Sequence, residues 1–338
     1  MACMLVIADG NNLSWAAFHS LGRAMGAETP EQKIRATLLG LSQSIIGPVA
    51  RGGAPFDPGM QLSFGDDPRF PPVTAIAVVF DQGRPLRRRE IFPAYQTGRE
   101  QQPAFIDNEP YVLAAIDQFV ESATACMPIT VLRGTNTEAD DLAAALTLQA
   151  RGPVRIVSSD RDFLQLVDSR VSIFSFIKKL LIDESNFDAE VMPRAKDSPP
   201  IVFPRERFVD YRALSGDSSD DLPGVPGIGS LTAAKLLVDH PVEAYLEQPS
   251  LVAATLGRAN RRVEEAFRDG TAAEVIARNR RLMDLRAAAA RYADLTEYRR
   301  NGRWDADAFR DWLQDLRAAR LDTEGAIATI AAVASRKS

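Results

Sequence analysis

The sequence predicts an α/β fold in which a mostly parallel sheet with flanking helices is followed by a largely helical region. Short, continuous apolar runs alternate with helical stretches through the first half of the chain. Such alternation is typical of parallel sheets with helices on both faces. Beyond residue 200 strand signals become scarce, and Ala, Arg, Leu and Glu dominate the composition.

Each expected element has its own local signal. A short, continuous apolar run at residues 4–8 indicates a strand that is buried on both faces, and a second buried strand is expected at 75–80. Short, mainly apolar runs predict a third strand at 129–132 and a fourth at 154–157. Expected helices occupy residues 13–46, 111–125, 139–149, 205–214 and 231–238. A last helix is predicted from four apolar residues at i, i+3, i+4, i+7 spacing, which we expect in the core: Phe309, Trp312, Leu313 and Leu316.

The length of 338 residues suits about two domains. We place the first at residues 1–200 and the helical one at 201–321, with a C-terminal tail at 322–338. Residues 47–72 are rich in Gly and Pro, which predicts a surface insertion in the first domain.

Composition excludes several classes of protein. Forty Lys and Arg against 45 Asp and Glu give a net charge of −5, which argues against coating nucleic acid through bulk charge. Two His and two Cys are too few for a zinc module or a disulfide framework, so any bound metal must be held mainly by oxygen. No basic segment precedes the apolar start, and no apolar run approaches the ~20 residues of a membrane span, so we expect a cytoplasmic protein.

Carboxylates follow each expected strand. The acids that come after the four strands, in chain order, are Asp9, Asp81, the group Glu138, Asp140 and Asp141, and the pair Asp160 and Asp162. Because the carboxyl ends of parallel strands share one edge of a sheet, these acids should converge there. Crowded carboxylates repel one another unless cations neutralise them, and Mg²⁺ or Mn²⁺ prefer such oxygen ligands.

A purely structural explanation covers part of this pattern. An Asp after a strand often starts a turn, and for Asp9 alone we favour that explanation. Residues 137–140, Thr-Glu-Ala-Asp, have the form of a helix capping box. A cap accounts neither for the adjacent Asp141 nor for the acids after another strand, so the set as a whole favours a metal site.

A second acidic group precedes a glycine-rich turn between two expected helices. Asp217, Asp220 and Asp221 come before the Gly-rich turn, which we define as residues 224–229. Glycines allow close approach of a phosphate, and helix N-termini favour anions, so such a turn could grip a nucleic-acid backbone without reading bases. A tight helix–turn–helix without a ligand is the alternative for Gly-Ile-Gly alone.

Six motifs in order resemble the 5′-nuclease family, which comprises flap endonucleases, the 5′→3′ exonuclease domain of bacterial DNA polymerase I and stand-alone bacteriophage 5′-nucleases. The motifs are Ile7-Ala-Asp-Gly-Asn-Asn12, Val79-Phe-Asp81, Pro93-Ala-Tyr95, Thr137-Glu-Ala-Asp-Asp141, Ser158-Ser-Asp-Arg-Asp162, and Gly216-Asp-Ser-Ser-Asp220 with Gly224-Val-Pro-Gly-Ile-Gly229. The similarity is strong over residues 4–240 and weaker towards Leu321. No polymerase portion follows, so we expect the stand-alone bacterial or bacteriophage type.

The resemblance implies a PIN-like nuclease domain, two divalent ions and a helix–three-turn–helix at residues 205–240 that holds duplex DNA. The implied ligands of the first ion are Asp9, Asp81, Glu138, Asp140 and Asp141, and those of the second are Asp160, Asp162, Asp217 and Asp220. The implied DNA-binding residues are Gly224, Val225, Gly227, Ile228, Gly229 and Lys235. A K⁺ ion held by backbone carbonyls near Val225 and Ile228 is implied as well.

Two positions depart from the family pattern. Gln96 stands where relatives carry a lysine that contacts the scissile phosphate, and Ala16 stands where an arginine is common. Both changes remove positive charge that would stabilise the transition state. Our hypothesis is that three nearby arginines, Arg84, Arg88 and Arg99, substitute in part. Arg88 and Arg99 match basic positions of the family and are the predicted catalytic residues beside Gln96.

The resemblance also implies an arch or clamp for the 5′ strand at residues 96–127. Arg99 is its one basic residue, so its grip on a single strand should be weak. Phe105 and Tyr111 could stack on bases, but packing against the sheet is the better explanation for them.

The leading hypothesis is a Mg²⁺-dependent, structure-specific 5′-nuclease that acts as a monomer on flapped, nicked or 5′-ended DNA, with RNA-primed strands as further candidates. The first alternative is a DNA-binding protein of the same fold with impaired cleavage, and a PIN-type ribonuclease is weaker. Six arginines of the helical half are candidates for phosphate contact or for a solvated helix face: Arg258, Arg261, Arg262, Arg278, Arg280 and Arg281.

Overall fold

The computed structural model describes residues 4–50, 71–316 and 322–337. The chain folds into two compact units, each assembled from separate segments. Residues 1–84, 106–183 and 289–338 form the first unit, and residues 85–105 and 184–288 form the second. Most of the predicted insertion at 47–72 lies outside the described residues.

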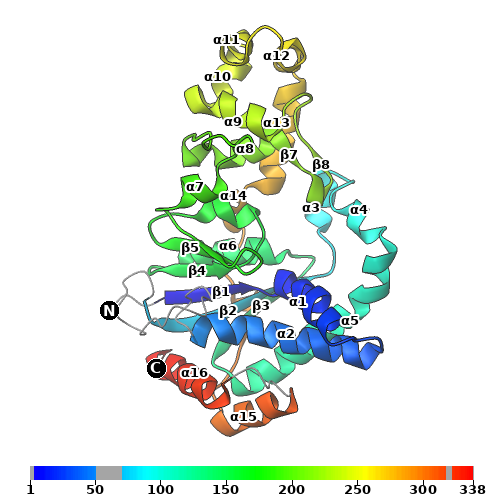
Figure 1. Ribbon diagram of the computed structural model, residues 1–338, viewed down its shortest axis with the longest axis vertical. Helices are drawn as coiled ribbons and strands as arrows, with labels where there is room; N and C mark the ends of the chain where they lie inside the picture. Colours follow the sequence, from blue (N-terminus) through cyan, green and yellow to red (C-terminus); the bar gives the residue numbers. More distant parts are fainter. Residues whose placement is uncertain (1–3, 51–70, 317–321, 338) are drawn as a thin grey trace. The chain divides into compact units, whose positions relative to one another are not determined.

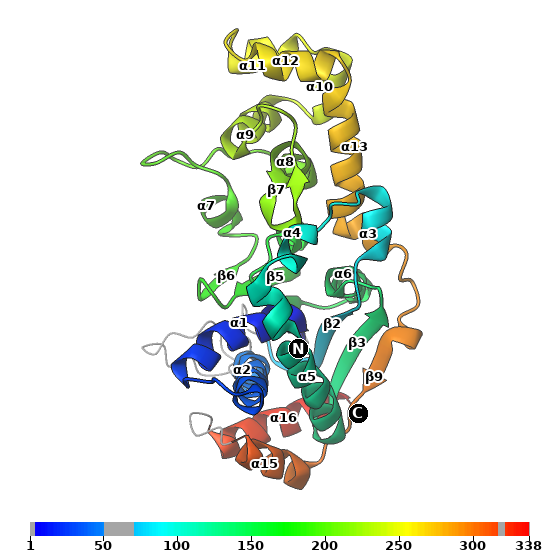
Figure 2. The ribbon, with the colours of Figure 1, turned by 90° about the vertical axis from the view of Figure 1, so that its right-hand side faces the viewer.

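The first unit is a seven-stranded sheet with helices on both faces (Figures 1 and 2). Its strands are β1 (Met4–Asp9), β2 (Val73–Gln82), β3 (Ile129–Thr135), β4 (Val154–Val157), β5 (Val171–Ser175), β6 (Leu180–Ile182) and β9 (Arg299–Asn301). They lie in the order β6-β5-β4-β1-β2-β3-β9. The pairs joining β5, β4, β1, β2 and β3 are parallel, whereas β6 and β9 are antiparallel edges. The predicted α/β class and the four predicted strands are therefore confirmed.

The helices of this unit divide between the two faces of the sheet. They are α1 (Gly10–Ala24), α2 (Pro30–Ala50), α5 (Pro103–Cys126), α6 (Ala139–Gln149), α15 (Ala306–Asp315) and α16 (Thr323–Lys337), with short 3₁₀ turns η1 (Asp162–Leu166) and η4 (Thr296–Tyr298). Buried residues of α2, α5, α15 and α16 share one core with the sheet. On the other face, α6 packs against β1, β2 and β3 (Figure 1).

Three boundaries differ from those expected. The helix with Phe309 and Trp312 packs in the core of the first unit rather than in the helical region. The expected tail contains α16, whose Ile330 and Val333 are buried in the same core. The expected arch is mostly α5, which packs on the sheet from Val112 onward. In each case helical apolar spacing supplies a face that the sheet buries.

The second unit is mainly helical. Its elements are α3 (Leu86–Ile91), α4 (Thr97–Glu100), α7 (Phe187–Val191), η2 (Arg205–Arg207), α8 (Phe208–Ser215), β7 (Gly216–Asp217), η3 (Ser218–Asp220), β8 (Leu222–Pro223), α9 (Ser230–Asp239), α10 (Val242–Glu247), α11 (Leu251–Leu256), α12 (Arg261–Arg268), α13 (Thr271–Met283) and α14 (Leu285–Ala289). The helices predicted at 205–214 and 231–238 are present, joined by the short β7–β8 hairpin and the Gly-rich turn. Of the helices that the structure describes, none combines the length and the hydrophobicity that crossing a bilayer requires.

Candidate active site

Asp9 lies at the carboxyl end of the central strand β1, where the chain order of the strands reverses. Its Oδ1 accepts a hydrogen bond of 3.1 Å from the Asn12 amide and so caps α1. Its Oδ2 accepts one of 2.7 Å from the Ser158 hydroxyl, which follows the neighbouring strand β4. Gly10 is required here because a Cβ would lie 2.2 Å from the Phe80 ring. The crevice at such a reversal is where open α/β sheets bind ligands.

Asp81 joins the end of β2 to the start of α6. Its Oδ1 accepts a hydrogen bond of 2.6 Å from the amide of Ala139, the first residue of that helix. The predicted capping box is therefore wrong: Glu138 is the N-cap residue and its side chain makes no capping bond, while Thr137 bonds to the Thr135 carbonyl. The cap comes instead from a neighbouring strand, which a local sequence motif cannot reveal.

The acids that follow β4 are arranged by a compact turn. The Asp160 amide donates to the Ser158 hydroxyl at 3.0 Å, and the Asp162 amide donates to Asp160 Oδ1 at 2.8 Å. Asn12 binds the same turn, because its Oδ1 accepts from the Ser159 amide at 3.0 Å. The ends of β1 and β4 are thus linked by side-chain bonds.

Carboxylates from four segments are close enough to perturb one another, and we call this group the acidic edge: Asp9, Asp81, Asp140, Asp160 and Asp162. Burial, with smaller contributions from neighbouring carboxylates, raises the pKa of Asp9 to about 7 despite its two hydrogen bonds. The pKa of Asp140 is raised well above its ordinary value by burial and by four surrounding carboxylates. Such a site favours either protonation or a bound cation.

The donor set of the acidic edge suits a divalent cation that keeps part of its water shell. In residues 4–50, 71–316 and 322–337, no three carboxylate, His or Cys side chains are near enough to hold a metal ion directly. Mg²⁺ typically binds through one or two carboxylates and retains several waters. Carboxylate oxygens from four segments, without nitrogen or sulfur ligands, match that preference.

Asp141 has a partner that distinguishes it from the acidic edge. It is buried, and its Oδ2 lies 3.2 Å from an Arg291 nitrogen. Arg291 belongs to the returning C-terminal segment of the first unit. Asp141 is thus neutralised by the protein, whereas Glu138 beside it is partly exposed.

The two predicted metal ligands of the second unit, Asp217 and Asp220, also have partners in the chain. Asp217 pairs with Arg212 and accepts from the Ser219 amide at 2.8 Å. Burial would raise the pKa of Asp217, but Arg212 and Ser219 hold it below the ordinary value. Asp220 is buried, and its Oδ1 accepts from the Gln96 side-chain amide at 2.9 Å.

Gln96 and Arg99 both lie against Asp220. Gln96 has a left-handed backbone, with φ of 55°, and its amide donates to the Asp220 carbonyl at 3.1 Å. The Arg99 guanidinium is 3.6 Å from Asp220 Oδ1 and keeps 45% of its side chain exposed. Asp221 accepts from the Gly98 amide at 2.7 Å, which fastens α4 to η3. Residues 96–99 are therefore placed by two successive aspartates.

The other basic candidates differ from Arg99. Arg88 is buried, its Nε donates to the Leu282 carbonyl at 2.9 Å, and its guanidinium lies over the Tyr95 ring. That position places it inside the second unit and not on the surface, and its catalytic role stays a prediction. Arg84, in the first unit, forms a bidentate pair with Glu109.

The Gly-rich turn is closed by its own backbone. The Val225 amide donates to the Leu214 carbonyl at 2.9 Å, and the Ile228 amide donates to the Val225 carbonyl at 3.0 Å. Val225 and Ile228 are buried, while Gly227, with φ of 85°, and Gly229 are exposed. Gly229 caps α9 without a side-chain bond and has open space where a Cβ would be. Lys235 is exposed on the same helix.

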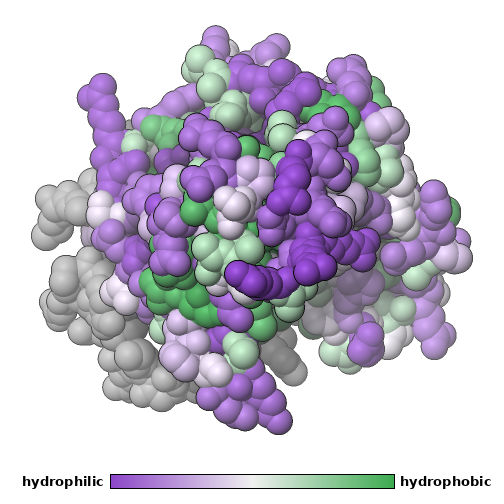
Figure 3. Space-filling view, turned by 90° about the horizontal axis from the view of Figure 1, so that it is seen from above, coloured by the Kyte–Doolittle hydropathy of each residue, from purple (hydrophilic) through white to green (hydrophobic). Residues whose placement is uncertain are grey.

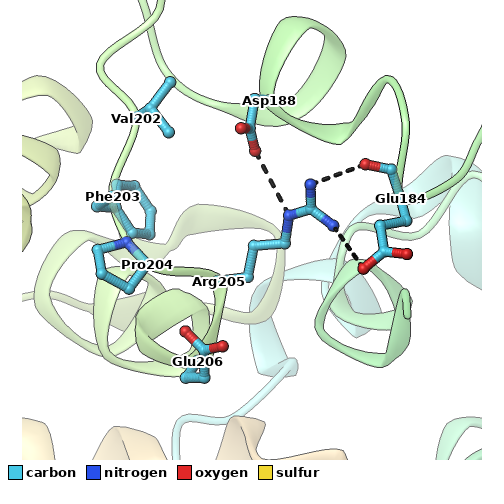
Figure 4. A pocket seen from close by; sticks show the side chains of 7 residues that line it. All are labelled: Glu184, Asp188, Val202, Phe203, Pro204, Arg205 and Glu206. Atoms are coloured by element: carbon cyan, nitrogen blue, oxygen red, sulfur yellow. Dashed lines mark hydrogen bonds and ion pairs between the residues drawn. The ribbon is translucent and has the colours of Figure 1, made fainter. Parts of the chain in front are cut away.

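A pocket of 460 Å³ in the second unit contains none of the predicted site residues. Figure 4 shows the Arg205 guanidinium between Asp188 and Glu184. It donates to the Asp188 carboxylate at 3.4 Å and to the Glu184 backbone carbonyl at 2.7 Å. Because the chain's own arginine satisfies these acids, the pocket offers no evident ligand site.

Three residues that orient the acidic edge were not predicted as site residues: Asn11, Asn12 and Ser158. Asn11 Oδ1 accepts from the Asp81 amide at 2.8 Å, and Asn12 and Ser158 connect β1 with β4 as described. Their closeness in sequence to the predicted ligands could have identified them, because each lies within three residues of one.

Comparison with known proteins identifies the class of protein that this fold and site define. Residues 67–192 match the family model described as 5′-3′ exonuclease, N-terminal resolvase-like domain, and residues 203–305 match 5′-3′ exonuclease, C-terminal SAM fold. The chain belongs to the 5′-3′ exonuclease family, and the predicted family is confirmed.

Individual relatives extend over most of the chain. It is 30% identical over 316 residues to DNA polymerase I of Mycobacterium tuberculosis strain H37Rv, covering 92% of this chain and 30% of that protein. It is 30% identical over 238 residues to the thermostable DNA polymerase I of Thermus filiformis, covering 70% of this chain and 24% of that protein. The chain thus spans less than a third of the length of these relatives.

Solved structures share the fold. The T5 D15 protein co-crystallised with metal ions superposes with a TM-score of 0.60 at 18% identity, covering 98% of this chain and 99% of that one. A complex of the T5 D15 flap endonuclease with DNA and metal ions gives a TM-score of 0.56 at the same coverage.

Proposed function

We propose that this chain is a divalent-metal-dependent, structure-specific 5′-nuclease that hydrolyses phosphodiesters near 5′ ends. The observation that carries the proposal is the acidic edge, where burial and like charges raise the pKa of Asp9 and Asp140. Carboxylates that are partly buried together repel one another, so the arrangement is unfavourable without a cation and supports a cation-binding site. The polymerase I relatives and the metal-bound T5 structures support the same activity.

The acidic edge would hold the ions, with Mg²⁺ the proposed cation and Mn²⁺ a substitute. When bound at such a site, divalent ions lower the pKa of water and stabilise the attacking and leaving oxygens of an in-line displacement. The chain's own contribution is orientation: Ser158 and the Asn12 amide aim Asp9, and the α6 N-terminus fixes Asp81. Glu138 and Asp141 are further proposed ligands, and Arg291 would compete for Asp141. Asp217 and Asp220 stay predicted ligands from the second unit.

The proposed substrate is DNA with a 5′ flap, nick or free 5′ end, and RNA-primed strands are included. The Gly-rich turn would contact the backbone of the duplex, since Gly227 and Gly229 are exposed beside the α9 N-terminus and Lys235. A K⁺ ion at the turn, action as a monomer and a cytoplasmic location in a bacterial or phage-infected cell belong to the proposal.

Gln96 and Ala16 favour a second candidate, a DNA-binding protein with impaired cleavage. Neither residue carries charge, and the Gln96 amide is engaged by Asp220. Arg99, three residues after Gln96, keeps nearly half of its side chain exposed. Its guanidinium would therefore supply positive charge to the reacting phosphate, which favours the nuclease.

The two candidates are separated by cleavage of a labelled 5′-flap duplex in Mg²⁺ and in EDTA. We expect product in Mg²⁺ and none with Asp160→Ala, while Asp307→Asn, which changes an exposed acid of α15, cuts like the wild type. Binding without any Mg²⁺-dependent product would replace the nuclease with the binding protein.

A further inference from the structure

Five of the six candidate arginines of the helical half fall into two groups in the structure, and the sixth, Arg281, is exposed on α13. Arg278 donates to the Pro223 carbonyl at 2.7 Å and lies over the Phe92 ring. Arg280 bonds to Asp210 and to Glu243, at 2.6 and 2.7 Å. These two side chains hold the second unit together and are not available to a ligand.

Arg258, Arg261 and Arg262 form the contrasting group, which we call the arginine surface. All three are exposed, in the loop that follows α11 and in the first turn of α12. Residues 248–263 contain no Asp or Glu. Farther along α12, Glu264 pairs with Arg268 and not with these arginines. Within the described residues, no ion pair neutralises the arginine surface.

The arginine surface adjoins the Gly-rich turn. Val263, next to Arg262, places a methyl carbon 3.2 Å from the position that a Cβ on Gly227 would occupy. Val263 is buried, so α12 packs directly on the turn, and α11 packs on α9. Figure 3 is seen from above Figure 1, the side on which α11 and α12 are labelled, and much of the surface it shows is hydrophilic.

We propose that Arg258, Arg261 and Arg262 are a second phosphate-binding surface, which extends the grip of the Gly-rich turn along the backbone of a nucleic-acid duplex. The proposal rests on the proposed function for the identity of the ligand. Three unneutralised guanidiniums without an apolar groove match a row of phosphates, because arginine binds phosphate through paired N–H groups. Contacts of this kind strengthen binding without reading sequence.

The test is the salt dependence of duplex binding by the full chain. The Kd for a flap duplex is measured by fluorescence anisotropy over a range of KCl, with Ca²⁺ replacing Mg²⁺. The variant is Arg258→Gln with Arg261→Gln and Arg262→Gln. The control removes the same charge from three exposed arginines of the first unit, Arg23→Gln with Arg151→Gln and Arg300→Gln. Circular dichroism melting shows whether each variant folds.

Removing three phosphate contacts should reduce the slope of log Kd against log[KCl] by about 2 to 3, since each contact adds about 0.9. The control should keep the wild-type slope, and the matching triple Lys variant should regain most of it. Equal slopes for the Gln variant and the control would overturn the proposal. Cleavage in Mg²⁺ is scored separately: wild type that binds with the expected slope yet never cuts removes the nuclease function and leaves the arginine surface standing.

Discussion

The two units treat buried and half-buried aspartates in opposite ways. In the first unit, Asp9 and Asp140 are surrounded by other carboxylates, and the pKa of each is raised. In the second unit, Asp217 pairs with Arg212 and its pKa is lowered. Asp220 accepts a hydrogen bond from Gln96 and forms an ion pair with Arg99. The negative charge of aspartate is thus left without a positive partner in the acidic edge of the first unit, whereas arginine and glutamine side chains of the chain itself offset it in the second unit.

The difference indicates where an external cation is needed. A buried carboxylate that already has a guanidinium partner gains less from a metal ion than one surrounded by like charges. We therefore expect the acidic edge to carry most of the metal dependence. Asp217 should act first as a structural anchor of the η3 turn.

The largest expected effect is on cleavage by the Asp140→Asn variant. Removing this charge from the centre of the acidic edge should lower the single-turnover rate by about 10³-fold or more, or about 4 kcal/mol of activation free energy. In EDTA the same variant should melt above the wild type, because repulsion is relieved, by about 2–4 °C for each kcal/mol.

The matched variant is Asp217→Asn. It should melt below the wild type, because Arg212 loses the partner that neutralises it in a buried position, at a cost of about 1–3 kcal/mol. If both variants shift the melting temperature in the same direction, the contrast between the two units is wrong.

The second effect is stabilisation by metal. Mg²⁺ at about 100 times its Kd should stabilise the folded chain by about 2.7 kcal/mol per site, since binding to the native state alone adds RT ln(1 + [L]/Kd). Thermal melts over a Mg²⁺ titration measure it, with Ca²⁺ and Mn²⁺ compared. Asp140→Asn should lose most of the shift, and Asp217→Asn should keep most of it. Loss of the shift in Asp217→Asn alone would move the main cation site to the second unit.

Much of this arrangement follows from short-range sequence signals. The short, mainly apolar runs became β1, β2, β3 and β4, and the acids after them lie at the carboxyl ends of parallel strands, as predicted. Local periodicity also specified α6, whose bounds match the prediction of residues 139–149.

Long-range pairing explains what the sequence did not reveal. β9 is three exposed residues that become a strand only by pairing with β3, far away in the chain. The capping role of Asp81 needs the register of β2 against the start of α6, and the burial of Arg88 needs the Leu282 carbonyl. Helical spacing alone also could not assign α15 and α16 to the first unit.

The third effect is a pH dependence of stability in EDTA. The pKa of Asp9 is raised from 3.8 to about 7, so the native state binds this proton more tightly than the unfolded chain. Its contribution is complete below the unfolded pKa and is lost as pH rises towards 7, by up to about 1.4 kcal/mol per pH unit. Urea unfolding at pH 5, 6 and 7 should show declining stability in the wild type and a shallower decline in Asp9→Asn.

Asp217 should give the opposite sign when the same unfolding measurements are extended to pH 4, 3 and 2. Its lowered pKa contributes stability above the unfolded value, and that contribution is lost as pH falls through the folded value, in the acid range below pH ~4. Saturating Mg²⁺ should flatten the decline between pH 5 and 7, because a bound cation keeps the acidic edge ionised. A wild-type curve that rises over that interval in EDTA would contradict the raised pKa of Asp9.

The smallest expected effect tests whether Arg99 neutralises Asp220 or serves the reacting phosphate. As a half-exposed ion pair at 3.6 Å it should contribute less than about 1 kcal/mol to folding, so Arg99→Ala should melt like the wild type. If the guanidinium stabilises the transition state, the single-turnover rate should still fall by about tenfold, less than for a buried donor because solvent weakens the interaction. Arg87→Ala, an exposed neighbour on α3, is the control, and Arg99→Lys should restore part of the rate. An unchanged rate in Arg99→Ala would show that Arg99 only neutralises Asp220, as Arg212 neutralises Asp217. The second unit would then contribute binding without chemistry.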